Sequence, residues 1–217
     1  MRPERLLALS SLAVALSGCP GRIIEPPVPP IVVDTPDAGS LARSARGNLR
    51  FKGPERLQAD FAAALELQPS DVCTELGQYQ CATFVHNVAL GGVDPYGPGL
   101  YESSGITAVT TPLVIDRLAW SACTKRVDLD LLAPGLAQVF RGVPMSNGKL
   151  TNPEGQEVSN LIVDLTRRAL TRDPYANEVT RYVKLAKDLE ATSAQPARAW
   201  MQSVCFAILS SAESVFY

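Results

Sequence analysis

One histidine, His86, is available for acid–base chemistry or metal binding among the 217 residues. A single imidazole excludes most zinc sites, which combine several histidine or cysteine ligands at characteristic spacings. His86 follows Cys81 by five residues, and a neighbouring imidazolium could lower the pKa of that thiol and make it a nucleophile. A disulfide at Cys81 would abolish this chemistry, so we expect His86 to be a structural residue at the edge of the core. We expect no metal site.

The segment SNGK, from Ser146 to Lys149, has the serine–lysine spacing of serine acyl enzymes. Those enzymes need both side chains on a helix, so that the lysine amine faces the hydroxyl. Asn147-Gly148 is instead a strong signal for a turn. We therefore expect a turn here and no catalytic role.

Three carboxylates, those of Asp116, Asp128 and Asp130, are close enough in sequence to suggest a cation site. Calcium takes six or more oxygen ligands, and helix ends commonly carry carboxylates that face water. We expect these three side chains to be solvated.

The start of the chain has the layout of a secretory signal. Arg2 and Arg5 precede the apolar stretch LLALSSLAVAL, which is too short to span a bilayer. The four residues from Leu16 to Cys19 then resemble the bacterial lipobox, in which an aliphatic and two small residues precede a cysteine that receives a diacylglyceryl group. The resemblance implies that residues 1–18 are removed as a signal peptide and that the mature chain begins at a lipidated Cys19.

A lipidated Cys19 would tether the protein without a membrane-spanning segment. Each buried methylene contributes about 0.8 kcal/mol, and one myristoyl chain is a marginal anchor, whereas three acyl chains on one residue hold it almost permanently. Pro20 follows the cysteine where enteric lipoproteins of the inner membrane carry aspartate. By that resemblance we expect the outer membrane.

Four cysteines remain after the signal: Cys73, Cys81, Cys123 and Cys205. An even number in an oxidising compartment favours two disulfides. The simplest pairing joins Cys73 to Cys81 and Cys123 to Cys205. One unbroken helix over residues 71–90 would place the first two about 12 Å apart, beyond disulfide reach. Gly77 permits a break between them, and the other two connectivities stay open.

Residues 19–46 are interpreted as the lipidated N-terminus and a proline-rich linker. Six prolines among residues 20–36 prevent helices and central strands and favour an extended, semi-rigid tether. Ile31 and Val32 lie in a segment that is more apolar than a solvated linker requires. They would pack against the chain's own domain or bind a partner.

Residues 47–217 are predicted to form one all-α, helical-bundle domain of about six helices. Helical spacing of apolar residues begins at Pro54, after Gly77, at Thr111, after Asn152, after Asp173 and at Arg198. In the second of these we expect Cys81, Phe84, Val85 and Val88 to face inward, and in the third Leu113. Asn152 and Asp173 are expected as helix caps. Fourteen uncharged residues between Arg198 and Glu213 predict a central buried helix.

The loop GGVDPYGPGLYESSG, residues 91–105, is the best candidate for binding outside the helices. Its glycines and prolines favour an irregular path, and Tyr96, Leu100 and Tyr101 offer contact surface of the kind enriched at protein interfaces. The alternative is a loop that folds over the helices and buries both tyrosine rings.

The C-terminal segments RRALTRDPYANEVTRYV and ARAWMQSVCFAILSSAESVFY resemble helical domains of unknown function in exported proteins of planctomycetes and myxobacteria. The resemblance covers about fifty-five residues. Many of those proteins also carry a haem-attachment motif. This chain has no C-x-x-C-H motif, so we expect no cofactor beyond the covalent lipid on Cys19.

Composition narrows the class of function. The chain is 46% apolar and 19% charged with a net charge of −2. It therefore lacks the excess of basic residues that would indicate a nucleic-acid partner. Its alanine, arginine and proline usage, with the lipobox, is similar to that of myxobacterial lipoproteins, some of which assist adventurous gliding motility. We expect a non-enzymatic outer-membrane lipoprotein that contacts other envelope proteins. The alternatives are an envelope enzyme that uses His86 with Asp94 and Glu102, and a binder of small apolar ligands between helices.

Overall fold

The computed structural model describes residues 49–97, 99, 101–102 and 108–217. Four of the predicted site residues, Cys19, Ile31, Val32 and Leu100, lie outside the described residues, as do the predicted signal peptide and linker.

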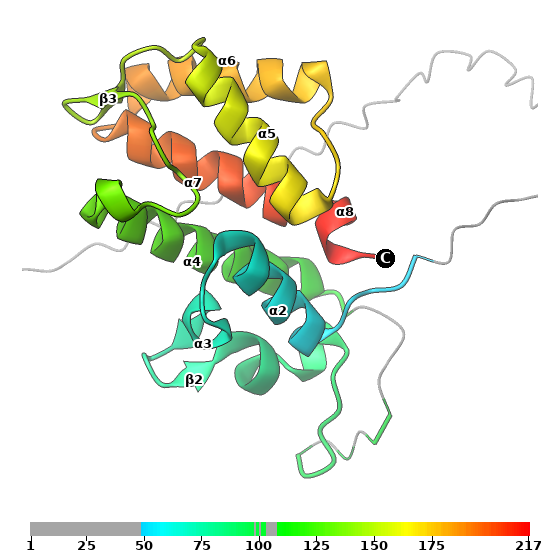
Figure 1. The fold of residues 1–217 in the computed structure, drawn as a ribbon. Coiled ribbons are helices and arrows are strands. Elements are labelled where there is room, and N and C mark those ends of the chain that lie inside the picture. Colours follow the sequence, from blue (N-terminus) through cyan, green and yellow to red (C-terminus); the bar gives the residue numbers. More distant parts are fainter. Residues whose placement is uncertain (1–48, 98, 100, 103–107) are drawn as a thin grey trace, which may run out of the picture. The chain divides into compact units, whose positions relative to one another are not determined.

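The described part of the chain is mostly helical, which confirms the predicted class (Figure 1). In chain order the elements are α2 (Pro54–Leu65), α3 (Pro69–Val72), β1 (Thr74–Glu75), β2 (Tyr79–Gln80), the π-helical turn η1 (Cys81–Val85), the 3-10 turn η2 (Val88–Leu90), α4 (Thr111–Leu132), the 3-10 turn η3 (Pro134–Leu136), β3 (Met145–Ser146), β4 (Lys149–Leu150), α5 (Gln156–Leu170), α6 (Ala176–Thr192), α7 (Pro196–Leu209) and α8 (Ala212–Val215). Among the described residues no helix combines the length and hydrophobicity needed to cross a bilayer.

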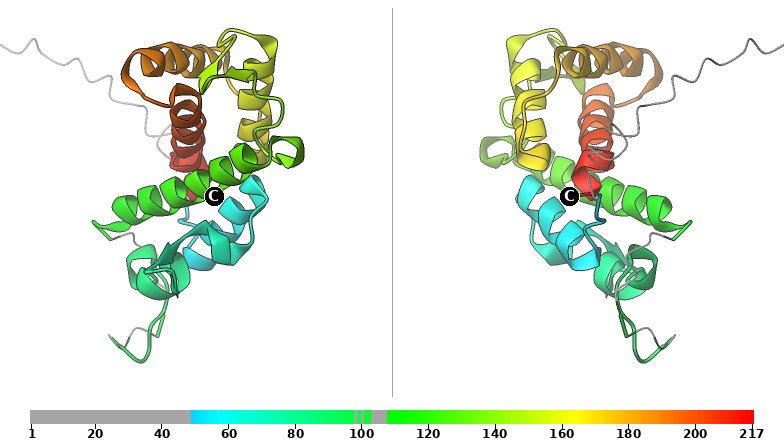
Figure 2. Two further views of the ribbon diagram at one scale, coloured as in Figure 1. Left: turned by 90° about the vertical axis from the view of Figure 1, so that its left-hand side faces the viewer. Right: turned by 90° about the vertical axis from the view of Figure 1, so that its right-hand side faces the viewer.

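Helix α4 lies between two groups of elements. On one side it contacts α2, α3 and the turns η1 and η2, and on the other it packs along α7, which also contacts α5, α6 and α8 (Figure 2). Trp200, Met201 and Ile208 of α7 are at most 2% exposed. The prediction of a central buried helix near the C-terminus is confirmed.

Two disulfides join the cysteines in the simplest predicted pairing. Cys73 pairs with Cys81 across a Cα–Cα distance of 5.4 Å, and Cys123 of α4 pairs with Cys205 of α7 across 5.8 Å. Cys123 and Cys205 are fully buried, so the second disulfide crosslinks the two central helices inside the core.

The helix expected after Gly77 is absent, and this prediction was wrong. Leu76 and Gly77 both have positive φ, at 52° and 71°, and the chain reverses there into the antiparallel hairpin β1–β2. The reversal brings Cys73 and Cys81 within disulfide reach. Only the single turns η1 and η2 follow, so Phe84, Val85 and Val88 are exposed instead of facing the core.

Two helices also start later in the chain than predicted. Helix α5 begins at Gln156, because residues 152–155 form a turn in which Gly155 N donates to the Asn152 carbonyl. Helix α6 begins at Ala176, after Tyr175, whose backbone N–H donates to the Glu178 carboxylate. Neither Asn152 nor Asp173 is therefore the cap.

One exposed apolar side chain on α4 also contradicts the sequence prediction. Leu113, expected to face inward, is 70% exposed. It lies between the buried residues Thr111 and Val114 on the side of α4 that faces away from the core.

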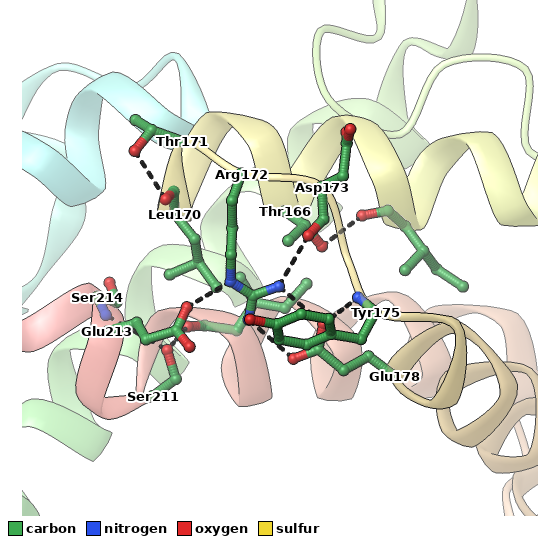
Figure 3. A network of polar contacts seen from close by, with 12 residues as sticks. Thr166, Leu170, Thr171, Arg172, Asp173, Tyr175, Glu178, Ser211, Glu213 and Ser214 are labelled. Atoms are coloured by element: carbon green, nitrogen blue, oxygen red, sulfur yellow. Dashed lines mark hydrogen bonds and ion pairs between the residues drawn. The ribbon is translucent and has the colours of Figure 1, made fainter.

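Arg172 fastens the α5–α6 turn to α8 (Figure 3). Its guanidinium donates to both carboxylate oxygens of Glu178 at 2.9 Å and to Glu213 at 2.6 Å. The ring of Tyr175 lies against the same guanidinium, 4.6 Å from centroid to Cζ. The two carboxylates, Glu178 first, raise the pKa of Arg172 further above its ordinary value. We interpret this network as structural, because a single guanidinium joins residues of the α5–α6 turn, α6 and α8.

Asp130 is buried rather than solvated, which corrects the expectation for it. One carboxylate oxygen accepts from Arg126 Nη2 at 2.6 Å and from Gln138 N at 2.9 Å, and the other accepts from Val139 N and Phe140 N at 3.1 and 2.9 Å. Asp130 is 3% exposed and Arg126 6%. The carboxylate thus holds the chain after η3 against the end of α4.

The first and last described segments pair with each other. Phe51 and Phe216 form an antiparallel bridge, in which Lys52 N donates to the Val215 carbonyl and Tyr217 N donates to the Arg50 carbonyl. The two phenylalanine rings meet edge to face with centroids 6.0 Å apart.

Asp130→Ala should lower the free energy of unfolding by about 3–5 kcal/mol, because it leaves the buried Arg126 charge and three backbone N–H groups without their acceptor. Asp128→Ala is the matched control on the same helix. Asp128 pairs with Arg198 at the surface, so its loss should cost at most about 1 kcal/mol. Urea titrations of both variants measure the difference, and equal losses would contradict the structural role of Asp130.

Alanine at both Cys123 and Cys205 should destabilise the protein more than alanine at both Cys73 and Cys81. The Cys123–Cys205 disulfide closes a loop of sequence separation 82, and the Cys73–Cys81 disulfide closes a loop of separation 8. Loop-closure entropy then gives losses of about 3–5 and about 1–3 kcal/mol respectively. Thermal and urea unfolding of the two double variants test the order.

Candidate functional site

The hairpin β1–β2 and the turns after it expose a group of apolar side chains, which we call the hairpin surface: Leu76, Tyr79, Phe84, Val85 and Val88. The rings of Tyr79 and Phe84 stack with centroids 5.4 Å apart and an interplanar angle of 14°. Leu76 is 88% exposed and Phe84 is 69% exposed. A cluster of large apolar side chains in water is typical of a surface that another molecule covers.

Glu75 sits beside this surface and binds Arg117 of α4. Arg117 donates to both carboxylate oxygens, through Nε and through Nη2, the latter at 2.7 Å. These hydrogen bonds lower the pKa of Glu75 and raise that of Arg117. The ion pair therefore ties the hairpin to α4.

His86 is placed next to the same carboxylate. Its Nε2 lies 3.5 Å from Glu75 Oε1, and its backbone N–H donates to the Cys81 carbonyl at 2.8 Å. The side chain is 27% exposed, in keeping with the expected position at the edge of the core. The cysteine–histidine dyad does not form, because Cys81 is in a disulfide.

A groove of about 560 Å³ adjoins the cluster along the outer face of α4. Cys73 and Thr74 line one side, and Arg117, Trp120 and Lys125 line the other. The indole of Trp120 is half exposed and packs edge to face on Phe206 of α7, with centroids 5.8 Å apart. Arg117 lines the groove and also binds Glu75 of the hairpin, so the groove lies next to the hairpin.

The sequence pattern did not point to Glu75, Arg117 or Trp120. Residues 113, 117, 120 and 124 of α4 lie on one helix face, away from the buried stripe through Leu118 and Ala122. Helix α4 carries large apolar residues on its exposed as well as its buried side, so its sequence pattern gave little signal for Trp120.

The residues proposed for an enzyme are not gathered at one place. The carboxylate that lies next to the His86 side chain is that of Glu75, which was not among the residues proposed for an enzyme. Asp94 instead accepts from the backbone N–H groups of Tyr96 and Gly97 in its own loop, at 3.2 and 2.9 Å, and Glu102 is exposed. The structure gives no specific support to the catalytic alternative.

The tyrosines of the loop after η2 are not folded over the helices. Tyr96 is 98% exposed and Tyr101 is 78% exposed. The alternative in which the loop buries both rings is therefore wrong, and both remain available for contact with another molecule.

SNGK forms the turn that was expected. Asn147 and Gly148 have φ of 51° and 75°, and Ser146 and Lys149 are cross-strand partners in the β3–β4 hairpin. The segment is thus not helical, as the serine–lysine mechanism would require.

One apolar recess that could take a small ligand lies between the start of α4 and α8. Pro112, Ile115, Val215 and Phe216 are among the residues that line it, and its volume is about 230 Å³. Ligand pockets typically measure about 300–1,000 Å³. The recess therefore supports the apolar-ligand alternative weakly.

No protein-family model, curated protein or solved structure matches this chain.

Glu75→Gln should reduce stability at pH 7 by at most about 1 kcal/mol, because the partner Arg117 is largely exposed to solvent. The folded-state pKa of Glu75 is lowered by Arg117, so its contribution exists above the unfolded pKa of about 4.3 and is lost as the pH falls through the folded value. Urea unfolding at pH 7 and at successively lower pH should show the difference from the wild type shrink as the Glu75 carboxyl becomes protonated in the folded state. Glu102→Gln is the control and should change stability at neither pH.

Proposed function

We propose that this protein is an outer-membrane lipoprotein that binds another envelope protein through the hairpin surface and the α4 groove. The observation that carries the proposal is the gathering of exposed Tyr79, Phe84, Trp120 and Arg117 on neighbouring elements. Aromatic side chains and arginine supply most of the energy at protein interfaces. Lipidation of Cys19, argued from the lipobox, would supply the location.

The proposed role is non-enzymatic. A tethered domain with a rigid, crosslinked core keeps one face in a fixed form, which favours binding without a large entropic cost. Gliding motility is the specific process we propose to test first, on the strength of the resemblance to myxobacterial lipoproteins.

A photo-crosslinking amino acid at position 84 tests the surface in living cells. Position 132 is the matched control, since Leu132 is also a highly exposed apolar residue of the described part, at 83%, but belongs to neither feature. We expect one envelope protein to crosslink from position 84 and not from position 132. Arg117→Glu should reduce that adduct at least about tenfold, the effect of losing one interface hot spot.

Cys19→Ser tests the anchor separately. The substituted chain should leave the membrane fraction, and the adduct at position 84 should fall with it. A gliding assay on cells that carry Phe84→Ser or Leu132→Ser then asks whether the surface serves motility. Equal crosslinking from positions 84 and 132 would contradict the proposed interface.

A further inference from the structure

The Cys73–Cys81 disulfide lies in a group of atoms that are all potential metal ligands. The two sulfur atoms and one carboxylate oxygen of Glu75 lie within 4.8 Å of one another. His86 lies outside this group of mutually close atoms, but its buried Nε2 atom is 3.5 Å from Glu75 Oε1. Two thiolates, one carboxylate and one imidazole are together a ligand set that zinc accepts.

The spacing of His86 and Glu75 suits a shared ion better than a hydrogen bond. Their 3.5 Å separation exceeds the 2.7–3.2 Å usual for N–H···O. Two ligands each about 2.1 Å from a tetrahedral ion lie roughly 3.4 Å apart. The two atoms are therefore placed as neighbouring ligands would be.

The backbone holds the four residues together without help from the disulfide. Cys81 N donates to the Cys73 carbonyl at 3.1 Å, Glu75 pairs with Tyr79 across the hairpin, and His86 N donates to the Cys81 carbonyl. We expect this frame to persist when the sulfur–sulfur bond opens, and Glu75 must then exchange at least one hydrogen bond from Arg117 for the ion. The sulfurs would then need to separate to roughly 3.8 Å, the distance between two thiolates on one zinc ion.

We propose that reduction of the Cys73–Cys81 disulfide creates a Zn²⁺ site formed by Cys73, Cys81, Glu75 and His86. A dithiol donor supplies two electrons and two protons to the cysteine sulfurs and leaves as its own disulfide. Zn²⁺ then binds both sulfurs and displaces the two thiol protons to solvent. The hairpin thereby has an oxidised form closed by a disulfide and a reduced form closed by a metal.

The test uses the full chain with Cys19→Ser, so that Cys19 adds no ligand. The oxidised chain and a chain reduced with a water-soluble phosphine, which takes up one oxygen from water as it reduces each disulfide, are given Zn²⁺ and then freed of excess metal. We expect one Zn²⁺ per reduced chain and none per oxidised chain. Replacing Zn²⁺ by Co²⁺ should give the visible absorption of a tetrahedral thiolate site.

Variants separate this site from the other thiols. Cys73→Ser with Cys81→Ser keeps Cys123 and Cys205 and should abolish stoichiometric binding. His86→Ala and Glu75→Ala should each weaken Zn²⁺ binding at least about tenfold, whereas Glu102→Ala should leave it unchanged. Circular dichroism follows the helices throughout.

Three results would overturn the proposal. They are equal binding by the Cys73→Ser, Cys81→Ser chain, equal binding by the oxidised chain, and a reduced chain that takes up no Zn²⁺ whether or not its helices persist. None of them bears on the envelope partner, which is tested with the disulfide intact.

Discussion

The contact between α4 and α7, closed by the Cys123–Cys205 disulfide, is the constraint on which the rest of the fold depends. Both cysteines are fully buried, so the crosslink fixes the two helices at the centre of the core. Helices α5, α6 and α8 pack on α7, while α2, α3 and the turns η1 and η2 pack on α4. The covalently joined pair thus links the two groups, which also touch directly where α2 contacts α5, and the core behind α4 supports the face beside the hairpin.

Helical periodicity predicted most of the elements because burial on one face leaves a direct trace in sequence. Leu57 and Phe61 of α2, and Val158 and Ile162 of α5, are buried as that spacing requires. The pattern fails at residues 77–90, where positive φ at Leu76 and Gly77 and a short-range disulfide decide the path. In this segment the preferences of the turn residues determined the structure, although the spacing of apolar residues was compatible with a helix.

The candidate site was harder to predict, for two physical reasons. It joins residues 75 and 117, whose contact depends on the packing of the hairpin against α4. Its apolar members, such as Phe84, had been assigned to the core because exposed and buried phenylalanines look alike in sequence. Asp130 shows the converse error, since a carboxylate expected in water is instead held by Arg126 and backbone N–H groups. The proposed function follows from these exceptions to simple patterning more than from the regular helices.

The bridge between Phe51 and Phe216 has a practical consequence for the topology of the chain. Because Tyr217 N bonds to the Arg50 carbonyl at 2.9 Å, the two ends of the folded unit meet at one point. Domains with adjacent ends tolerate circular permutation. A short linker could join Tyr217 to the segment before Phe51, with new termini at the exposed Asn147-Gly148 turn. A reporter fused after Tyr217 would likewise emerge beside residues 50–52.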